Sequence, residues 1–145
     1  MRWIVAMAGV LAMLIVSVSS AAKDKTETEP KPKADPTGTW KWTADPDGLA
    51  LERSVMLRLE KGNLSGKYVS SPGRRGKEIK EALFKDGTVT FSLPVVAGPG
   101  ITFRSIYTGK VVGDTIKGKM TIITDLEDGT SSTGVLEWVA KRVKK

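Results

Sequence analysis

The sequence predicts an all-β protein, an eight-stranded antiparallel up-and-down barrel, from three observations. Apolar and polar residues alternate through most of residues 37–143, a period of two that is typical of half-buried strands. Short connections such as Lys85-Asp86-Gly87 separate these runs and contain residues that tolerate positive φ. Because the connections are short, each strand should pair with its sequence neighbour. The resulting meander leaves two exposed edges unless the sheet closes into a barrel.

Eight strands are expected, at about residues 38–43, 53–60, 63–70, 78–84, 87–94, 101–111, 114–124 and 133–142. Glycines within the strands, such as Gly66 and Gly118, mark the sharp bends that a small barrel needs. The stretch 77–84 also fits a short helix. We expect a strand there, because Lys85-Asp86-Gly87 would then join it to the next strand as a hairpin.

The first 22 residues have the pattern of a secretory signal. Arg2 provides a positive charge, Ile4 to Val16 form an unbroken apolar run of 13 residues, and small residues follow up to Ala22. A membrane anchor is the alternative, but a spanning helix needs about 20 apolar residues. We therefore expect cleavage near Ala22, a secreted or periplasmic protein, and no transmembrane helix in the mature chain.

Residues 23–36 separate the signal from the predicted domain at 37–143. Their charges alternate, they include three prolines, and they have no aliphatic side chain larger than that of Ala34. Such a segment cannot bury enough apolar surface to offset its ordering entropy, which predicts a disordered linker. Residues 144–145 form a short basic tail.

The composition excludes several kinds of chemistry. The chain has no histidine and no cysteine, so it can form no disulfide, no thiolate nucleophile, no Ser-His-Asp triad and no Cys/His zinc site. Glu78, Glu81 and Glu137 are the acids nearest strand interiors, but their spacing pairs none of them for hydrolysis. We expect a protein that is not an enzyme and that has no cofactor.

Two acidic segments, Asp45–Gly48 and Asp125–Gly129, suggest calcium, which prefers clustered carboxylates. Neither forms a twelve-residue loop with a terminal glutamate, and Asp-Gly is a common turn sequence. The turn interpretation is favoured, so no metal site is expected.

The inward-facing aromatic residues are candidates for a ligand cavity. Trp42, Tyr68, Phe103 and Tyr107 occupy positions that can face the barrel interior, where the two phenols would orient a small ligand. The alternative is that these side chains simply fill the barrel, since eight strands leave room for either a packed core or one small ligand.

Residues at both ends of the predicted domain resemble the calycins, the group that includes lipocalins and avidins. Gly38-Thr39-Trp40 opens the first strand, and Trp138 and Arg142 stand on the last. The resemblance implies that a basic residue of the last strand, here Arg142, packs over Trp40 at the closed end of the barrel. A guanidinium on an indole face is worth roughly 0.5–2 kcal/mol. Gly38, Trp40, Trp138 and Arg142 are thus the expected barrel-closing residues.

The first part of the domain is similar to avidins in particular. Thr37-Gly38-Thr39-Trp40 is followed by a strand with the pattern G-x-L-x-G-x-Y-x-S, which ends in Tyr68 and Ser70. In avidins the matching tyrosine and serine contact the ligand, which implies that Tyr68 and Ser70 bind one here. Trp42 stands where avidins have an asparagine, and the later pocket tryptophans have no counterparts. The resemblance therefore implies the fold but not biotin binding.

A basic loop suggests a possible anionic partner. Arg74, Arg75 and Lys77 cluster in and after a glycine-rich segment of a chain with a formal net charge of +7. Nucleic acid is not expected, because no stacking aromatic residue lies beside the loop and the chain has an export signal. The sequence predicts an exported barrel that binds a small apolar or amphipathic ligand. The alternative is a structural or accessory envelope module with a filled barrel and basic loops contacting anionic surfaces.

Overall fold

The structure, a computed structural model, describes residues 33–44 and 50–144. The expected signal at 1–22, most of the expected linker at 23–36 and the acidic segment Asp45–Gly48 lie outside these residues. Within the described ranges, no helix has the length and apolarity needed to cross a membrane.

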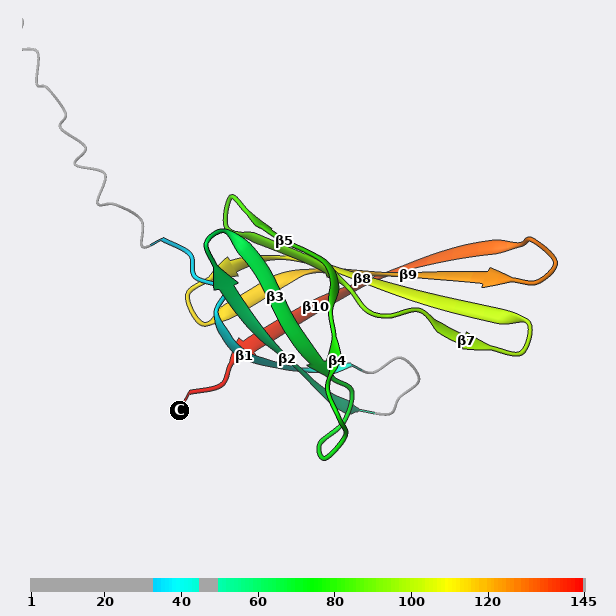
Figure 1. Cartoon of the computed structure of the whole chain (residues 1–145), viewed down its shortest axis with the longest axis horizontal. Coiled ribbons are helices and arrows are strands. Elements are labelled where there is room, and N and C mark those ends of the chain that lie inside the picture. Colours follow the sequence, from blue (N-terminus) through cyan, green and yellow to red (C-terminus); the bar gives the residue numbers. More distant parts are fainter. Residues whose placement is uncertain (1–32, 45–49, 145) are drawn as a thin grey trace, which may run out of the picture. The chain divides into compact units, whose positions relative to one another are not determined.

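The prediction of an all-β fold is confirmed for the described residues, which form ten strands and no helix. The strands are β1 (Gly38–Ala44), β2 (Leu51–Glu60), β3 (Asn63–Val69), β4 (Lys77–Glu78), β5 (Lys80–Lys85), β6 (Thr88–Ser92), β7 (Val96–Gly98), β8 (Ile101–Val112), β9 (Thr115–Leu126) and β10 (Ser131–Arg142). All their pairings are antiparallel. β7 and the far ends of β8, β9 and β10 project beyond the other strands (Figure 1).

The strand count of eight was wrong for two physical reasons. The strand expected at 78–84 is divided into β4 and β5, because Glu81 has a φ of 50° and the register of β5 against β6 shifts between Lys80 and Leu83. The buried Ser92 hydroxyl donates a 2.8 Å hydrogen bond to Glu81 Oε2 across this irregularity. The short strand β7, which pairs with β8, lies between the strands expected at 87–94 and 101–111.

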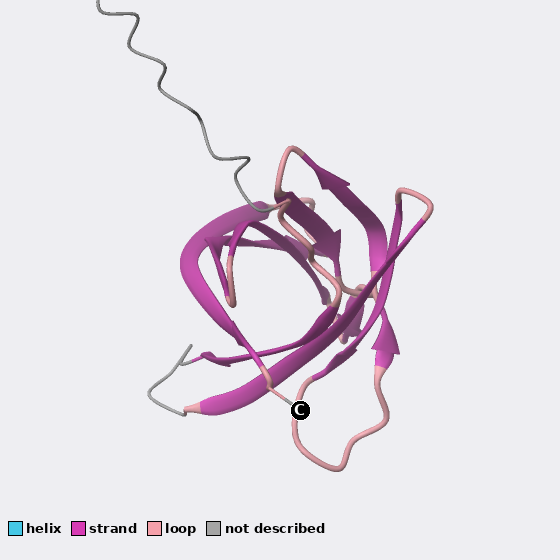
Figure 2. Ribbon diagram, turned by 90° about the vertical axis from the view of Figure 1, so that its left-hand side faces the viewer, coloured by secondary structure: helices cyan, strands magenta, loops and turns pink. Residues whose placement is uncertain are grey.

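The sheet forms a nearly closed barrel. Its strand order is β4-β3-β2-β1-β10-β9-β8-β6-β5, so the two ends of the order are consecutive along the chain. The Ile79 amide between them donates a 3.1 Å hydrogen bond to the Gly66 carbonyl of β3. First and last strands meet through Trp40↔Arg142 and Lys41↔Lys141. Figure 2 shows the strands as a ring around the interior.

Glycines allow neighbouring strands to approach where the barrel bends. Gly109 of β8 pairs with Gly118 of β9. A Cβ on Gly118 would meet the Thr108 carbonyl, and one on Gly109 would lie 3.1 Å from Trp138 Cζ2. Because only glycine leaves this space free, the bend and the position of the Trp138 ring depend on the pair.

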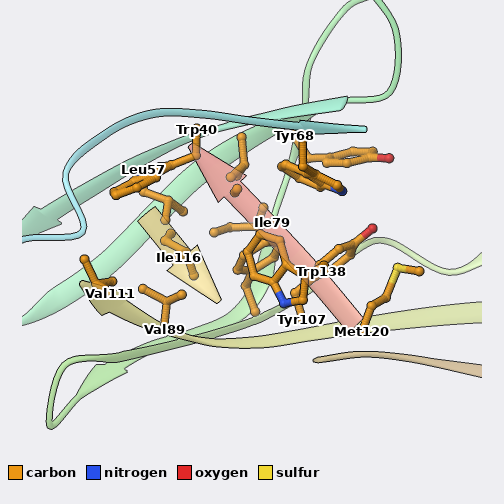
Figure 3. Close-up of a cluster of buried hydrophobic side chains, with 14 of the residues drawn as sticks. Trp40, Leu57, Tyr68, Ile79, Val89, Tyr107, Val111, Ile116, Met120 and Trp138 are labelled. Atoms are coloured by element: carbon orange, nitrogen blue, oxygen red, sulfur yellow. The ribbon is translucent and has the colours of Figure 1, made fainter. Parts of the chain in front are cut away.

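One half of the barrel interior is a packed core. Every second residue of these strands points inward and supplies a side chain to this core. The fully buried side chains include Trp40, Val55, Leu57, Val89, Phe91 and Ile116. Figure 3 shows the aliphatic part of this cluster, with Leu57, Val89, Val111 and Ile116, at one end. Complete burial of such a side chain is worth about 1.5–3 kcal/mol, so this half supplies much of the stability.

Barrel contacts begin upstream of the boundary expected at Thr37. Pro36 is fully buried, and its carbonyl accepts a 2.8 Å hydrogen bond from Trp40 Nε1. The Asp35 carbonyl accepts a 2.7 Å hydrogen bond from Arg142 Nη2, and Ala34 packs against the core. The end of the predicted linker is thus docked, because it caps the core beside Trp40.

Candidate functional site

The closed end of the barrel brings together three of the four expected barrel-closing residues. The Arg142 guanidinium carbon lies 4.2 Å from the centre of the Trp40 ring. Arg142 Nε donates a 3.0 Å hydrogen bond to Asp114 Oδ1, and Nη1 donates to the Thr37 carbonyl. Gly38 has a φ of 138°, and a Cβ there would lie 2.8 Å from Arg142 Nη1. This cluster therefore joins the last strand to the first.

Trp138, the fourth expected closing residue, lies in a separate aromatic layer. Its ring centre is 5.2 Å from those of both Trp42 and Tyr107. Tyr107 also stacks on Phe91 at 5.0 Å, and Trp138 Nε1 donates a 3.2 Å hydrogen bond to the Thr108 carbonyl. This aromatic layer, composed of Trp42, Phe91, Tyr107 and Trp138, separates the packed core from the open half of the barrel.

Two adjoining cavities occupy the open half. The first has a volume of about 600 Å³ and the second about 460 Å³. Both are lined by Arg53 of β2 and by Phe103 and Ser105 of β8, so they adjoin at these three residues. The barrel interior thus has a packed half and a half that contains cavities.

The first cavity is the basic one. Arg74 and Arg75 from the segment between β3 and β4 line it together with Lys77 of β4 and Arg53, and no described acid does. Its apolar wall comes from Leu93, Pro94, Val96 and Phe103. Four positive charges facing one cavity create a field that favours anions.

The second cavity is mainly apolar and lies where β1 and β10 separate. Only two residue pairs join these strands, and beyond them Trp42 to Ala44 and Leu136 to Trp138 face the cavity. Met120 and Ile122 of β9 complete the apolar wall, and Glu137 is the one described acid that borders it. The cavity therefore lies beside the part of β1 and β10 where no ladder pair joins them.

The expected ligand-binding residues divide among these features. Tyr68 and the exposed Ser70 line the first cavity, Trp42 lines the second, and Phe103 lines both. Tyr107 is fully buried in the aromatic layer and lines neither cavity. Figure 3 places the hydroxyls of Tyr68 and Tyr107 on the side of the cluster where Met120 lies, away from Val89 and Val111.

Arg53 is the site residue that the sequence analysis missed. Its Nη1 donates a 3.0 Å hydrogen bond to Tyr68 Oη, whereas its Nε is shielded from solvent and has no hydrogen-bond partner. The signal was present in the sequence, because Arg53 has the same parity as the buried Val55 and Leu57. A charged residue in an inward-facing series marks a polar site in the interior.

Burial keeps both phenols of the site protonated. Desolvation raises the pKa of Tyr68 above 10.0, although the neighbouring Arg53 guanidinium acts in the opposite direction. Desolvation, with a smaller contribution from Tyr68, raises the pKa of Tyr107 to about 12. Tyr107 Oη is buried without a hydrogen-bond partner. At neutral pH each group is therefore a hydroxyl that can donate a hydrogen bond.

The described acids do not assemble a metal site. No group of three or more acidic side chains that could hold a metal is present among residues 33–44 and 50–144. In the segment Asp125–Gly129, Asp125 accepts a 2.6 Å hydrogen bond from Ser131, and Asp128 accepts a 2.8 Å bond from the Thr130 amide. These bonds hold a turn between β9 and β10, whereas Asp45–Gly48 lies outside the described residues.

Comparisons with family models, with curated proteins and with solved structures find no match for the chain. The cavities and their lining residues therefore carry the functional argument.

Proposed function

We propose that the protein is an exported, non-enzymatic barrel of the calycin type that binds one small amphipathic ligand in its two adjoining cavities. The observation that carries this proposal is the contrast between the cavities, one basic and one mainly apolar, joined at Arg53, Phe103 and Ser105. A molecule with a polar and an apolar part can place each part against a matching wall.

The size of the cavities supports a small ligand. Volumes of about 600 and 460 Å³ fall within the 300–1,000 Å³ range of ordinary ligand sites, which are concave, mostly apolar and contain a few placed polar groups. Trp42, Met120 and Trp138 provide a fixed apolar wall, because all three are already buried in the aromatic layer or beside it.

Two features support the calycin type. Counting β4 and β5 as one interrupted strand and β7 as an addition leaves eight strands in the meander, the number first expected. The contact between Arg142 and Trp40 joins last strand to first, as the resemblance implies. Export rests on the pattern of residues 1–22, which predicts a secreted or periplasmic location after cleavage near Ala22.

The experiment is a titration with N-phenyl-1-naphthylamine, a neutral apolar dye whose fluorescence rises out of water. We expect saturable binding of about one dye per chain. Ser105→Trp would place a large side chain where the two cavities adjoin and should weaken binding at least about tenfold. Ser132→Trp is the matched control, because Ser132 is exposed on β10 and lines neither cavity.

Absence of saturable binding, or equal effects of the two substitutions, would contradict the proposal. The alternative would then be favoured, namely an envelope module whose exposed Arg74 and Arg75 contact an anionic surface. Binding of the protein to anionic but not to neutral vesicles, unchanged in Ser105→Trp, is the result expected of that alternative.

A further inference from the structure

We propose that the ligand has an oxyanion head group, a carboxylate or a phosphate monoester, which Arg53 binds as counter-ion while Tyr68 donates a hydrogen bond to it. This inference rests on the proposed function and specifies the chemistry of its ligand. The apolar part of the same molecule would lie in the second cavity, against Trp42 and Met120.

No acidic side chain among the described residues forms an ion pair with Arg53 inside the barrel. Three ion pairs join described residues, Lys41 with Glu52, Arg58 with Glu60 and Arg142 with Asp114, and Arg53 belongs to none of them. Its Nε is buried without any partner, although a shielded guanidinium normally has its donors satisfied. An arginine presents its N–H groups as a planar fork that fits carboxylate and phosphate oxygens.

The Tyr68 phenol supplies a neutral donor beside this charge. Tyr68 Oη accepts the hydrogen bond from Arg53, so its own proton remains available to a ligand atom in the first cavity. Figure 3 places this hydroxyl on the side of the core cluster where Met120 lies. Arg53 and Tyr68 both line the first cavity, so one oxyanion there can accept a hydrogen bond from each of them.

The remaining charges order the ligand within the site. Arg74, Arg75 and Lys77 line the first cavity together with Arg53 and Tyr68, and none of the three pairs with a described acid. Glu137 borders only the second cavity. An anionic head is therefore attracted to the first cavity, and a cationic one is repelled from it.

The test is a competition in which purified protein holds N-phenyl-1-naphthylamine and twelve-carbon compounds displace it. Dodecanoate, dodecyl phosphate, dodecanol and dodecyltrimethylammonium share an apolar chain and differ in the head. We expect dodecanoate or dodecyl phosphate to displace the dye at concentrations at least about tenfold lower than dodecanol, and the cation to be the weakest. The better of the two anions identifies the source of the oxyanion.

Arg53→Gln should remove most of this preference for the anion over dodecanol. Arg104→Gln is the matched control, because it removes the same charge from an exposed position on β8 that lines neither cavity. Tyr68→Phe provides a second variant, since it deletes the hydroxyl that contacts Arg53 in the first cavity and keeps the ring. It should weaken dodecanoate binding several-fold more than dodecanol binding.

The outcomes separate this inference from the function on which it rests. If the dye binds saturably but dodecanol competes as well as dodecanoate, or Arg53→Gln and Arg104→Gln have equal effects, the oxyanion inference is overturned while ligand binding stands. If the dye does not bind at all, the proposed function fails and the inference fails with it. If inorganic phosphate alone displaces the dye as strongly as dodecyl phosphate does, the proposal of an amphipathic ligand is also overturned.

Discussion

Tyr107→Phe should preserve stability at pH 8 and change how stability depends on alkaline pH. The hydroxyl of Tyr107 is fully buried and has no hydrogen-bond partner, so its desolvation is uncompensated in the folded protein. Removing an unsatisfied buried polar group is neutral or stabilising by about 1 kcal/mol. The ring itself, stacked on Phe91 at 5.0 Å, is retained by phenylalanine.

The pH effect follows from the raised pKa of Tyr107. The folded value is about 12 against an ordinary value of 10.0, so between pH 10 and 12 the unfolded chain has released a proton that the folded chain keeps. The unfolded state then binds fewer protons, and the free energy of unfolding falls as pH rises. This residue alone should lower stability by about 1.4 kcal/mol at pH 11, with a limit of about 2.7 kcal/mol above pH 12.

Urea unfolding of wild type and variant at pH 8, 10 and 11 measures this effect. Titrating groups away from Tyr107 contribute equally to both proteins, so the difference between them measures Tyr107 together with its coupling to Tyr68. Tyr68→Phe is the contrasting control, because it removes the acceptor of the Arg53 hydrogen bond and should destabilise at pH 8 by about 1 kcal/mol. If the free energies of unfolding of wild type and Tyr107→Phe change in parallel from pH 8 to 11, the claim that the Tyr107 phenol is buried and protonated is refuted.

Three further predictions concern the scaffold. The effects of Trp40→Ala and Arg142→Ala on the free energy of unfolding should be non-additive, with a coupling near 1 kcal/mol from the 4.2 Å contact between the guanidinium and the ring. A coupling energy within about 0.3 kcal/mol of zero in the double-mutant cycle would show that this contact does not contribute to stability. Deleting residues 23–32 should leave the melting temperature unchanged, whereas deleting 23–36 should lower it by several degrees, because Pro36 is buried against Trp40. Equal melting temperatures of the two deletion variants would contradict the claim that residues 34–36 are docked on the barrel. Gly118→Ala should destabilise by more than about 2 kcal/mol in thermal unfolding, because its Cβ would meet the Thr108 carbonyl, and a loss below about 0.5 kcal/mol would show that the strands can separate there.

Period-two patterning predicted much of the fold because each strand has one buried face. Val55 and Leu57 are buried while Met56 and Arg58 are exposed, as alternation requires. Short connections then paired neighbouring strands, and the last strand reached the first. The division of the strand near Ile79 was not predictable in this way, because it depends on a positive φ at Glu81, a residue type that carries no such signal.

The candidate site was predicted in part. Aromatic residues at inward positions identified Trp42, Tyr68 and Phe103, all of which line a cavity. The hollow itself depends on the short ladder between β1 and β10 and on strands that project beyond the ring, and neither can be derived from local patterning. Arg53 was missed because the aromatic signal covers only apolar residues of inward parity, and Arg53 is the charged residue of that parity on β2.

The tryptophan indole N–H signals test the central claim of ligand binding most directly. In an ¹⁵N–¹H spectrum, signals assigned by single Trp→Phe substitutions can be followed as dodecanoate is added. Trp42 and Trp138 line the second cavity, whereas Trp40 lies at the closed end with its Nε1 bonded to the Pro36 carbonyl. The account predicts saturable shifts of the Trp42 and Trp138 signals with the Trp40 signal unmoved. Shifts confined to Trp40, or no shift of any of the three at saturating dodecanoate, would contradict it.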